Sequence, residues 1–133
     1  MPISRTPLVQ YAALAALKPE NDAFVTEVLA QLQAQRALAL EFIQKIPHLS
    51  CVVPTGAFYL YPDVSGLLNR SFIGQRIENV DRLAELLLEQ ARIAVVPGSA
   101  FGSDRHVRIS YAIPAQEIEL GLTHLECFVR SLT

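Results

Sequence analysis

The chain carries the stretch Val95-Val96-Pro97-Gly98-Ser99-Ala100-Phe101-Gly102, followed after three residues by His106-Val107-Arg108-Ile109-Ser110-Tyr111-Ala112. The first segment is a glycine-bounded loop, and the second alternates apolar and polar residues as a strand does. Because side chains alternate between the two faces of a strand, Arg108 should share the polar face with His106 and Ser110. A guanidinium held on a strand matches a carboxylate with two parallel hydrogen bonds. Arg108 is therefore a candidate anion-binding residue.

The spacing of this loop excludes two other kinds of site. The Gly-x-Ser-x-Gly pattern of a nucleophile elbow is absent, because Ser99 directly follows Gly98. The Gly-Lys-Ser/Thr ending of a phosphate-binding loop is also absent. Periodicity alone predicts that Arg108 is an exposed residue or the partner in a local ion pair, because these are the commoner roles of strand arginines.

Four segments, in order along the chain, change that interpretation: residues 10–17 (QYAALAAL), 56–59 (GAFY), 94–102 (AVVPGSAFG) and 108–112 (RISYA). Together they resemble the carboxyl-terminal, small domain of the fold-type I, pyridoxal-phosphate-dependent class I/II aminotransferases, the aspartate aminotransferase-like group in particular. The resemblance implies that Arg108 binds the α-carboxylate of an amino acid or 2-oxo acid substrate. It also implies that Gly56 lies close to that substrate.

The same resemblance implies pyridoxal 5′-phosphate as the cofactor of the full-length family. There the cofactor lysine lies in a Ser-x-x-Lys segment followed by a Gly-x-Arg-x-Gly turn, upstream of the helix that residues 10–17 resemble. This chain has no such segment; Lys18 precedes Pro-Glu-Asn and Lys45 precedes Ile-Pro-His. A lysine that binds the cofactor covalently needs burial or cationic neighbours to lower its pKa. We therefore expect no cofactor-binding or catalytic residue in this chain, which alone should not transaminate.

Composition and net charge restrict the kinds of partner that the chain is expected to bind. The chain has 133 residues, 51% hydrophobic and 18% charged, with a net charge of −2, whereas globular domains are usually about 25% charged. This deficit predicts a face covered by the amino-terminal cofactor domain or by a second copy of the chain in a homodimer. The scattered arginines leave no electrostatic footprint for nucleic acid. No apolar run approaches the roughly 18 residues of a membrane span, and no signal peptide is recognisable, so a cytoplasmic location is expected.

The cysteines predict neither a disulfide framework nor a metal site. Cys51 and Cys127 are far apart in the sequence and are expected to be free thiols in the core. His124 and Cys127 are spaced i, i+3 on a predicted helix, but no third ligand lies near them in the sequence. Because zinc sites normally use three or four protein ligands, no metal is expected.

The pattern as a whole predicts one α+β domain over residues 1–133, with a connecting helix in 1–18 and the small domain in 19–133. A small mixed or antiparallel sheet should carry helices packed on one face. Helices are expected after Thr6, from Pro19 to Pro47, after Asn79 and from about Pro114. Strand segments are expected around the turn at 54–56, at 93–96 and at 106–112, and a long loop is expected at 65–78.

The expected function is therefore substrate-carboxylate binding in an aminotransferase of the aspartate or aromatic amino acid type, inactive without the lysine segment. The alternative is a non-catalytic dimerisation or interaction domain derived from an aminotransferase. A self-sufficient enzyme is disfavoured, because the sequence shows no paired carboxylates and no histidine–nucleophile arrangement.

Overall fold

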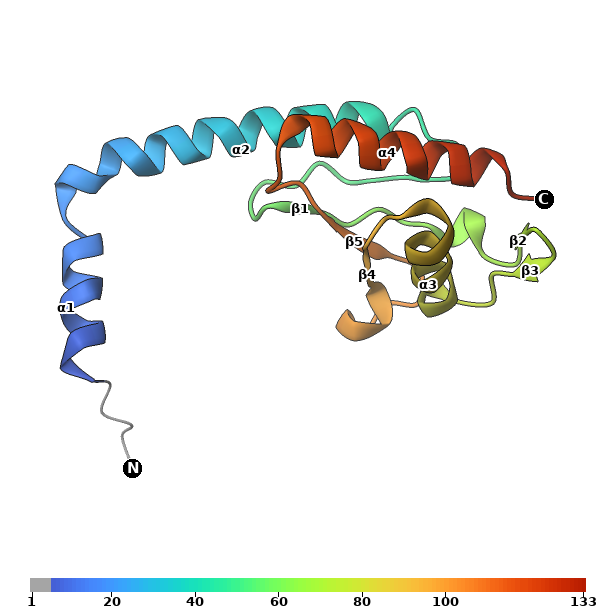
Figure 1. The fold of residues 1–133 in the computed structure, drawn as a ribbon, viewed down its shortest axis with the longest axis horizontal. Helices are drawn as coiled ribbons and strands as arrows, with labels where there is room; N and C mark the ends of the chain where they lie inside the picture. The colour runs from blue at the N-terminus through green and yellow to red at the C-terminus, as the bar shows by residue number, and fades with distance from the viewer. Residues whose placement is uncertain (1–5) are drawn as a thin grey trace. The chain divides into compact units, whose positions relative to one another are not determined.

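The computed structural model describes residues 6–133; residues 1–5 of the predicted connecting segment lie outside the described part. The chain divides into two compact units, residues 1–31 and 32–133. Figure 1 shows an α+β fold of helices and short antiparallel strands. In chain order its elements are α1 (Pro7–Ala16), η1 (Pro19–Asn21), α2 (Asp22–Ile43), β1 (Tyr59–Leu60), η2 (Ser65–Leu67), β2 (Ser71–Phe72), β3 (Gln75–Arg76), α3 (Val80–Ala91), β4 (Val96–Pro97), η3 (Gly98–Phe101), β5 (Val107–Ser110) and α4 (Ala115–Arg130).

The first unit consists of α1, η1 and the first part of α2. Pro7 begins α1, as predicted, because proline at a helix start loses no hydrogen bond. Pro19 begins only the short η1, and the long helix predicted from Pro19 to Pro47 extends from Asp22 to Ile43. Thr6 precedes α1 but makes no side-chain capping hydrogen bond. Asn21 ends the connection by donating a hydrogen bond from Nδ2 to the Ala15 carbonyl oxygen, at 2.8 Å. The large apolar side chains of this unit are exposed: Leu8, Val9, Tyr11, Leu14, Leu17, Phe24, Val25 and Leu29.

The second unit begins within α2, where the apolar stripe becomes buried. Ala39, Leu40 and Ile43 of this stripe lie in the core. Arg36, which interrupts the predicted stripe, donates from Nη1 to the Pro54 carbonyl oxygen at 2.9 Å, and Gln35 donates from Nε2 to the Ile113 carbonyl oxygen at 2.8 Å. The polar residues of α2 thus attach the helix to two loops of the same unit.

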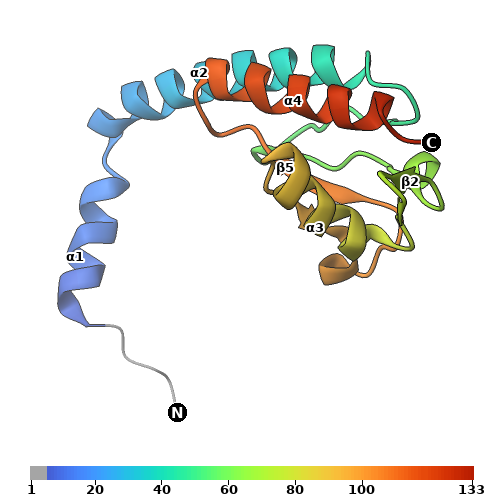
Figure 2. The ribbon, with the colours of Figure 1, turned by 45° about the vertical axis from the view of Figure 1, so that its right-hand side comes forward.

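The main sheet has the order β1-β5-β4 and is antiparallel throughout. Val107 and Tyr111 are buried and Ser110 is exposed, which confirms the predicted alternation along this segment. Leu60 of β1 is fully buried opposite Ile109. Figures 1 and 2 show α4 beside the last turns of α2 and over the sheet. The inward stripe of α4 is buried as expected: Ile118, Leu122, Leu125, Phe128 and Val129.

Helix α3 also matches its prediction. Asn79 caps it, because its Oδ1 accepts a hydrogen bond from the Arg82 backbone N–H at 2.8 Å. The side chains of Leu83, Leu86 and Leu87 are fully buried. The helix packs against β4 and α4 and so closes the end of the core next to β4.

Three predicted segments differ in the structure. Residues 51–53 form no strand, and only an isolated bridge joins Ser50 to Asp63. The strand predicted at 93–96 is reduced to the two residues of β4. The long loop predicted at 65–78 is wrong, because it holds η2 and the β2–β3 hairpin. Its turn residues Ile73 and Gly74 have positive φ, and a β-branched residue in that conformation is rare, so the sequence carried no hairpin signal there.

The structure shows where the two cysteines and the other potential metal ligands lie. Both cysteines are free; Cys51 is half-buried, but Cys127 lies on the exposed side of α4, so its predicted core position is wrong. Within residues 6–133, no three His, Cys, Asp or Glu side chains gather as metal ligands do. Over the same residues, no helix has the length and apolar character needed to cross a membrane.

We expect Asp63 to govern acid stability. Burial opposes its ionisation, but hydrogen bonds from Ser65 and the ion pair with Arg105 outweigh burial and hold the pKa of Asp63 at about 2. Because this lies below the ordinary value of about 3.9, the stabilisation is complete above roughly pH 4–5 and is lost as pH falls toward 2. Urea unfolding of Asp63→Asn at pH 7 should show a loss on the order of 1–2 kcal/mol.

In Asp63→Asn, the loss of stability that protonation of Asp63 causes between roughly pH 4–5 and pH 2 should be absent. Glu41→Gln is the control, because Glu41 pairs with Lys45 at 2.7 Å but both side chains are largely exposed. Equal stability of Asp63→Asn and the parent chain from pH 7 to pH 3 would refute the role of Asp63.

Candidate functional site

Arg108 lies at the centre of the sheet, in β5 opposite Val96 of β4. Its side chain is half-buried. The guanidinium carbon lies 5.4 Å from the centre of the Tyr59 ring and 4.9 Å from the centre of the Phe101 ring. These are distances at which aromatic faces attract a cation. Two rings from different parts of the chain therefore hold the charged group.

The N–H donors of Arg108 are not used within residues 6–133, where no hydrogen bond or ion pair engages them. Arg92, which is exposed at the end of α3, also has no hydrogen bond or ion pair within these residues. Other arginines donate to backbone or side-chain acceptors: Arg36, Arg70, Arg76, Arg82, Arg105 and Arg130. A half-buried guanidinium with free donors can bind a carboxylate through two parallel bonds.

The loop before β5 positions Phe101. Residues Gly98–Phe101 form η3, and Gly102 ends it with φ 76°, a conformation that favours glycine. Ser99 fixes this turn to α3 by donating from Oγ to Asp81 Oδ1 at 2.7 Å. A Cβ on Gly98 would lie 2.4 Å from the His106 carbonyl oxygen. The glycines thus allow the loop to approach the start of β5 closely.

A second aromatic layer supports the first. Tyr61 meets Phe101 edge to face at 6.3 Å and stacks on His106 at 4.7 Å with an interplanar angle of 7°. His106 Nδ1 lies 2.7 Å from Ser103 Oγ. The Tyr61 hydroxyl is buried and has no hydrogen-bond partner among the described residues. Ring contacts, rather than polar bonds, organise this face of the sheet.

Sequence reasoning did not assign Tyr59 and Phe101 to the site. A signal for Tyr59 was present, because it alternates with the buried Leu60 and so lies on the Arg108 face. The antiparallel register puts Tyr59 opposite Ser110, which makes it a diagonal neighbour of Arg108. Phe101 had no comparable signal, because the path of a loop depends on tertiary contacts.

Gly56 lies in the bend that precedes β1. The β1–β5 pairing extends to a hydrogen bond from the Tyr111 N–H to the Phe58 carbonyl oxygen, and Gly56 follows beyond that end of the ladder. It is exposed, and a Cβ added there would meet nothing within 4 Å. The fold brings Arg108 together with Tyr59 and Phe101, whereas a Cβ built on Gly56 has none of these side chains within 4 Å.

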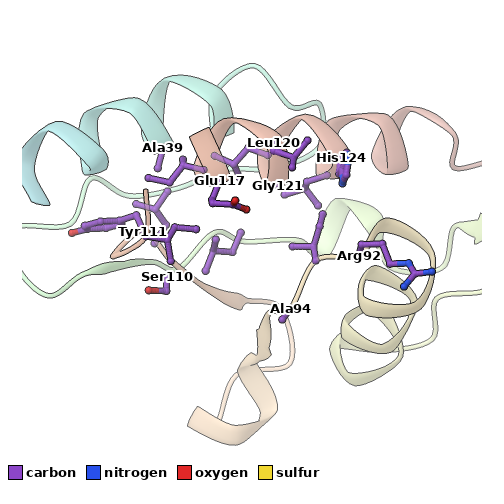
Figure 3. A pocket seen from close by; sticks show the side chains of 16 residues that line it. Ala39, Arg92, Ala94, Ser110, Tyr111, Glu117, Leu120, Gly121 and His124 are labelled. Carbon is purple, nitrogen blue, oxygen red and sulfur yellow. The ribbon is translucent and has the colours of Figure 1, made fainter. Parts of the chain in front are cut away.

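A cavity of about 360 Å³ lies between α4 and the sheet. Figure 3 shows Glu117 over this cavity, with Arg92 and His124 toward one end and Tyr111 toward the other. Its walls are mainly apolar and include Ile109, which points away from Arg108. The cavity therefore belongs to the opposite face of β5 and adds no group to the Arg108 site.

The residues present do not fit covalent binding of pyridoxal phosphate. The Lys18 ammonium lies 3.5 Å from Glu20 and the Lys45 ammonium 2.7 Å from Glu41. Their side chains are 59% and 61% exposed, respectively. A reactive lysine requires desolvation or cationic neighbours, whereas each of these has water and a carboxylate. The site can bind an anion but provides no attachment for that cofactor.

The sequence matches the aminotransferase class I and II family over residues 2–125. The chain belongs to this family. Its similarity to aminotransferases extends to the probable aspartate/prephenate aminotransferase of Aquifex aeolicus, which is 38% identical over 122 residues. That alignment covers 91% of this aminotransferase-family chain and 29% of the relative. The chain thus spans less than one third of the length of that relative.

Solved aminotransferases share the fold. The aspartate aminotransferase of Rhizobium meliloti superposes with a TM-score of 0.83 at 34% identity, over 92% of this chain and 30% of that one. The aromatic aminotransferase of Pyrococcus horikoshii gives a TM-score of 0.74 at 32% identity, over 90% and 30% of the two chains. The α+β class predicted from the sequence is confirmed by these structures and by the elements described above.

Proposed function

We propose that this chain is the C-terminal, substrate-carboxylate-binding domain of a pyridoxal-phosphate-dependent aminotransferase of the aspartate or aromatic amino acid type. The observation that carries this proposal is the half-buried Arg108 guanidinium, whose donors are free within residues 6–133. Residues 1–18 would connect to the cofactor domain and 19–133 would form the small domain. Gly56 stays a predicted substrate neighbour.

Arg108 orients a substrate but cannot bind it tightly alone. Two hydrogen bonds to a charged group contribute about 3–6 kcal/mol, but association costs at least about 4 kcal/mol of translational and rotational freedom. A dissociation constant of 1 mM requires about 4.1 kcal/mol after that cost. The domain alone should therefore bind an amino acid or 2-oxo acid no more tightly than several millimolar. Pyridoxal phosphate supplies an electron sink when bound to the complete enzyme. The role of this chain's own residues is to fix the substrate carboxylate on the β5 face.

The experiment compares the chain alone with a chimera in which it replaces the matching segment of the Aquifex aeolicus relative. The chain alone should show no stoichiometric, borohydride-reducible attachment of pyridoxal phosphate to a lysine, because Lys18 and Lys45 are exposed and paired. The chimera should transaminate aspartate or an aromatic amino acid. A folded chimera that binds cofactor but has no activity, or a single stoichiometrically labelled lysine in the chain alone, would contradict the proposal.

The exposed apolar side chains of residues 7–29 favour a second candidate, a non-catalytic dimerisation domain derived from an aminotransferase. These side chains recur along α1 and the first part of α2, and exposed apolar surface that forms a large patch usually marks an interface. Sedimentation of the chain alone, together with the activity of the chimera, separates the two candidates. A stable dimer with an inactive chimera supports the interaction domain, whereas an active chimera supports the carboxylate-binding domain.

A further inference from the structure

The Arg108 guanidinium is unusual in how it is held. Protein arginines are commonly fixed by carboxylates or carbonyl oxygens, as Arg105 is by Asp63 and Arg36 by the Pro54 carbonyl oxygen in this chain. Such partners use the N–H donors that a ligand would need. Arg108 instead has the faces of Tyr59 and Phe101, at 5.4 and 4.9 Å. An aromatic face attracts the cation through its quadrupole and leaves the in-plane N–H donors free.

The two rings are themselves fixed by separate parts of the fold. Tyr59 is paired with Ser110 in the sheet, and its ring meets Phe58 edge to face at 6.1 Å. Phe101 is carried by η3, which the Ser99–Asp81 hydrogen bond joins to α3. The Phe101 ring is also contacted by Tyr61 at 6.3 Å. Each ring therefore has a defined position before any ligand arrives.

We propose that Tyr59 and Phe101 are positioning residues that orient the Arg108 guanidinium for a carboxylate. This inference rests on the proposed function and adds the source of the orientation. A long arginine side chain loses much conformational freedom when it binds a ligand. Contacts that restrict the guanidinium beforehand reduce this loss, while the fork of donors stays available. The two rings thus raise carboxylate affinity without touching the carboxylate.

The test uses the full chain, labelled with ¹⁵N, and sodium propionate as the carboxylate, titrated against sodium chloride at equal ionic strength. The Nε–Hε signal of Arg108 is assigned by its loss in Arg108→Leu. In the parent chain this signal should move with propionate and saturate. Phe101→Leu and Tyr59→Leu should each shift the free signal and weaken propionate binding about two- to tenfold, the fold-change that an ordering cost of about 0.5–1.5 kcal/mol for one side chain implies.

Two further variants make the result specific. Phe101→Tyr keeps a ring beside the guanidinium and should restore parent affinity. Phe24→Leu is the matched control, because Phe24 is an exposed phenylalanine outside the cluster, and it should change neither the signal nor the affinity. Thermal unfolding of Phe101→Leu should stay close to that of the parent, because the Phe101 ring is 52% exposed. If Phe101→Leu does not fold, Tyr59→Leu carries the same comparison.

The outcomes distinguish this inference from the proposed function. Unchanged affinity and an unchanged Arg108 signal in both folded ring variants overturn the positioning role, even if propionate binds through Arg108. No response of the Arg108 signal to propionate in the parent chain contradicts the proposed carboxylate site. In that case a changed free signal in Phe101→Leu still supports the ring contact with the guanidinium.

Discussion

In the chimera that carries this domain, Arg108→Leu is expected to lower kcat/KM by about a hundredfold or more while cofactor absorbance stays unchanged. The loss follows from two charge-assisted hydrogen bonds of about 1.5–3 kcal/mol each, since every 1.4 kcal/mol changes an equilibrium or rate tenfold. The cofactor signal should persist because no residue of this chain is expected to bind that group. Steady-state kinetics with aspartate and an aromatic amino acid, together with the visible spectrum, provide the measurement.

Arg92→Leu is the matched control for this result. Like Arg108, Arg92 has no hydrogen bond or ion pair among the described residues, but it lies at the end of α3 and is exposed. Its replacement should leave kcat/KM within about twofold, because Arg92 lines the cavity on the opposite face of β5 and not the Arg108 site. If Arg108→Leu turned over substrate as fast as this control, Arg108 would have no carboxylate-binding role and would be only a ring-packed surface residue.

Gly98→Ala is expected to be the most destabilising small substitution in the second unit. The added Cβ would lie 2.4 Å from the His106 carbonyl oxygen and 2.5 Å from the Ser103 carbonyl oxygen. Both obstacles are backbone atoms, so η3 and the start of β5 must separate. Overpacking typically costs about 1–3 kcal/mol, and two clashes with backbone oxygens put this variant at the upper end, about 3 kcal/mol. For a domain of this size, thermal unfolding should show a fall in Tm of more than about 10 °C.

Gly121→Ala provides the opposite control. Gly121 lies inside α4, and a Cβ there would meet nothing within 4 Å. Alanine in a helix interior is favoured over glycine by about 0.5–1 kcal/mol, so this variant should raise Tm slightly. Equal Tm values for the two variants would show that the close approach at Gly98 does not hold the loop against β5.

The helices could be predicted because their signals are local. Asn79 as a cap, Pro114 before the last helix and the leucine stripe of α3 each act within a few residues, and the structure places all of them as expected. The hairpin at residues 71–76 could not be predicted, because Ile73 adopts positive φ against its local preference. Cys127 was placed in the core by residue type alone, although its position on α4 faces outward.

The sequence by itself determined the α+β class, the family and the choice of Arg108, since alternation on a strand and ordered motifs are properties of the chain. Only the tertiary structure decided what surrounds Arg108. Tyr59 reaches it through the β1–β5 register and Phe101 through the path of η3, so their contacts join segments far apart in sequence. No local pattern encodes such contacts, because they depend on how the whole unit packs.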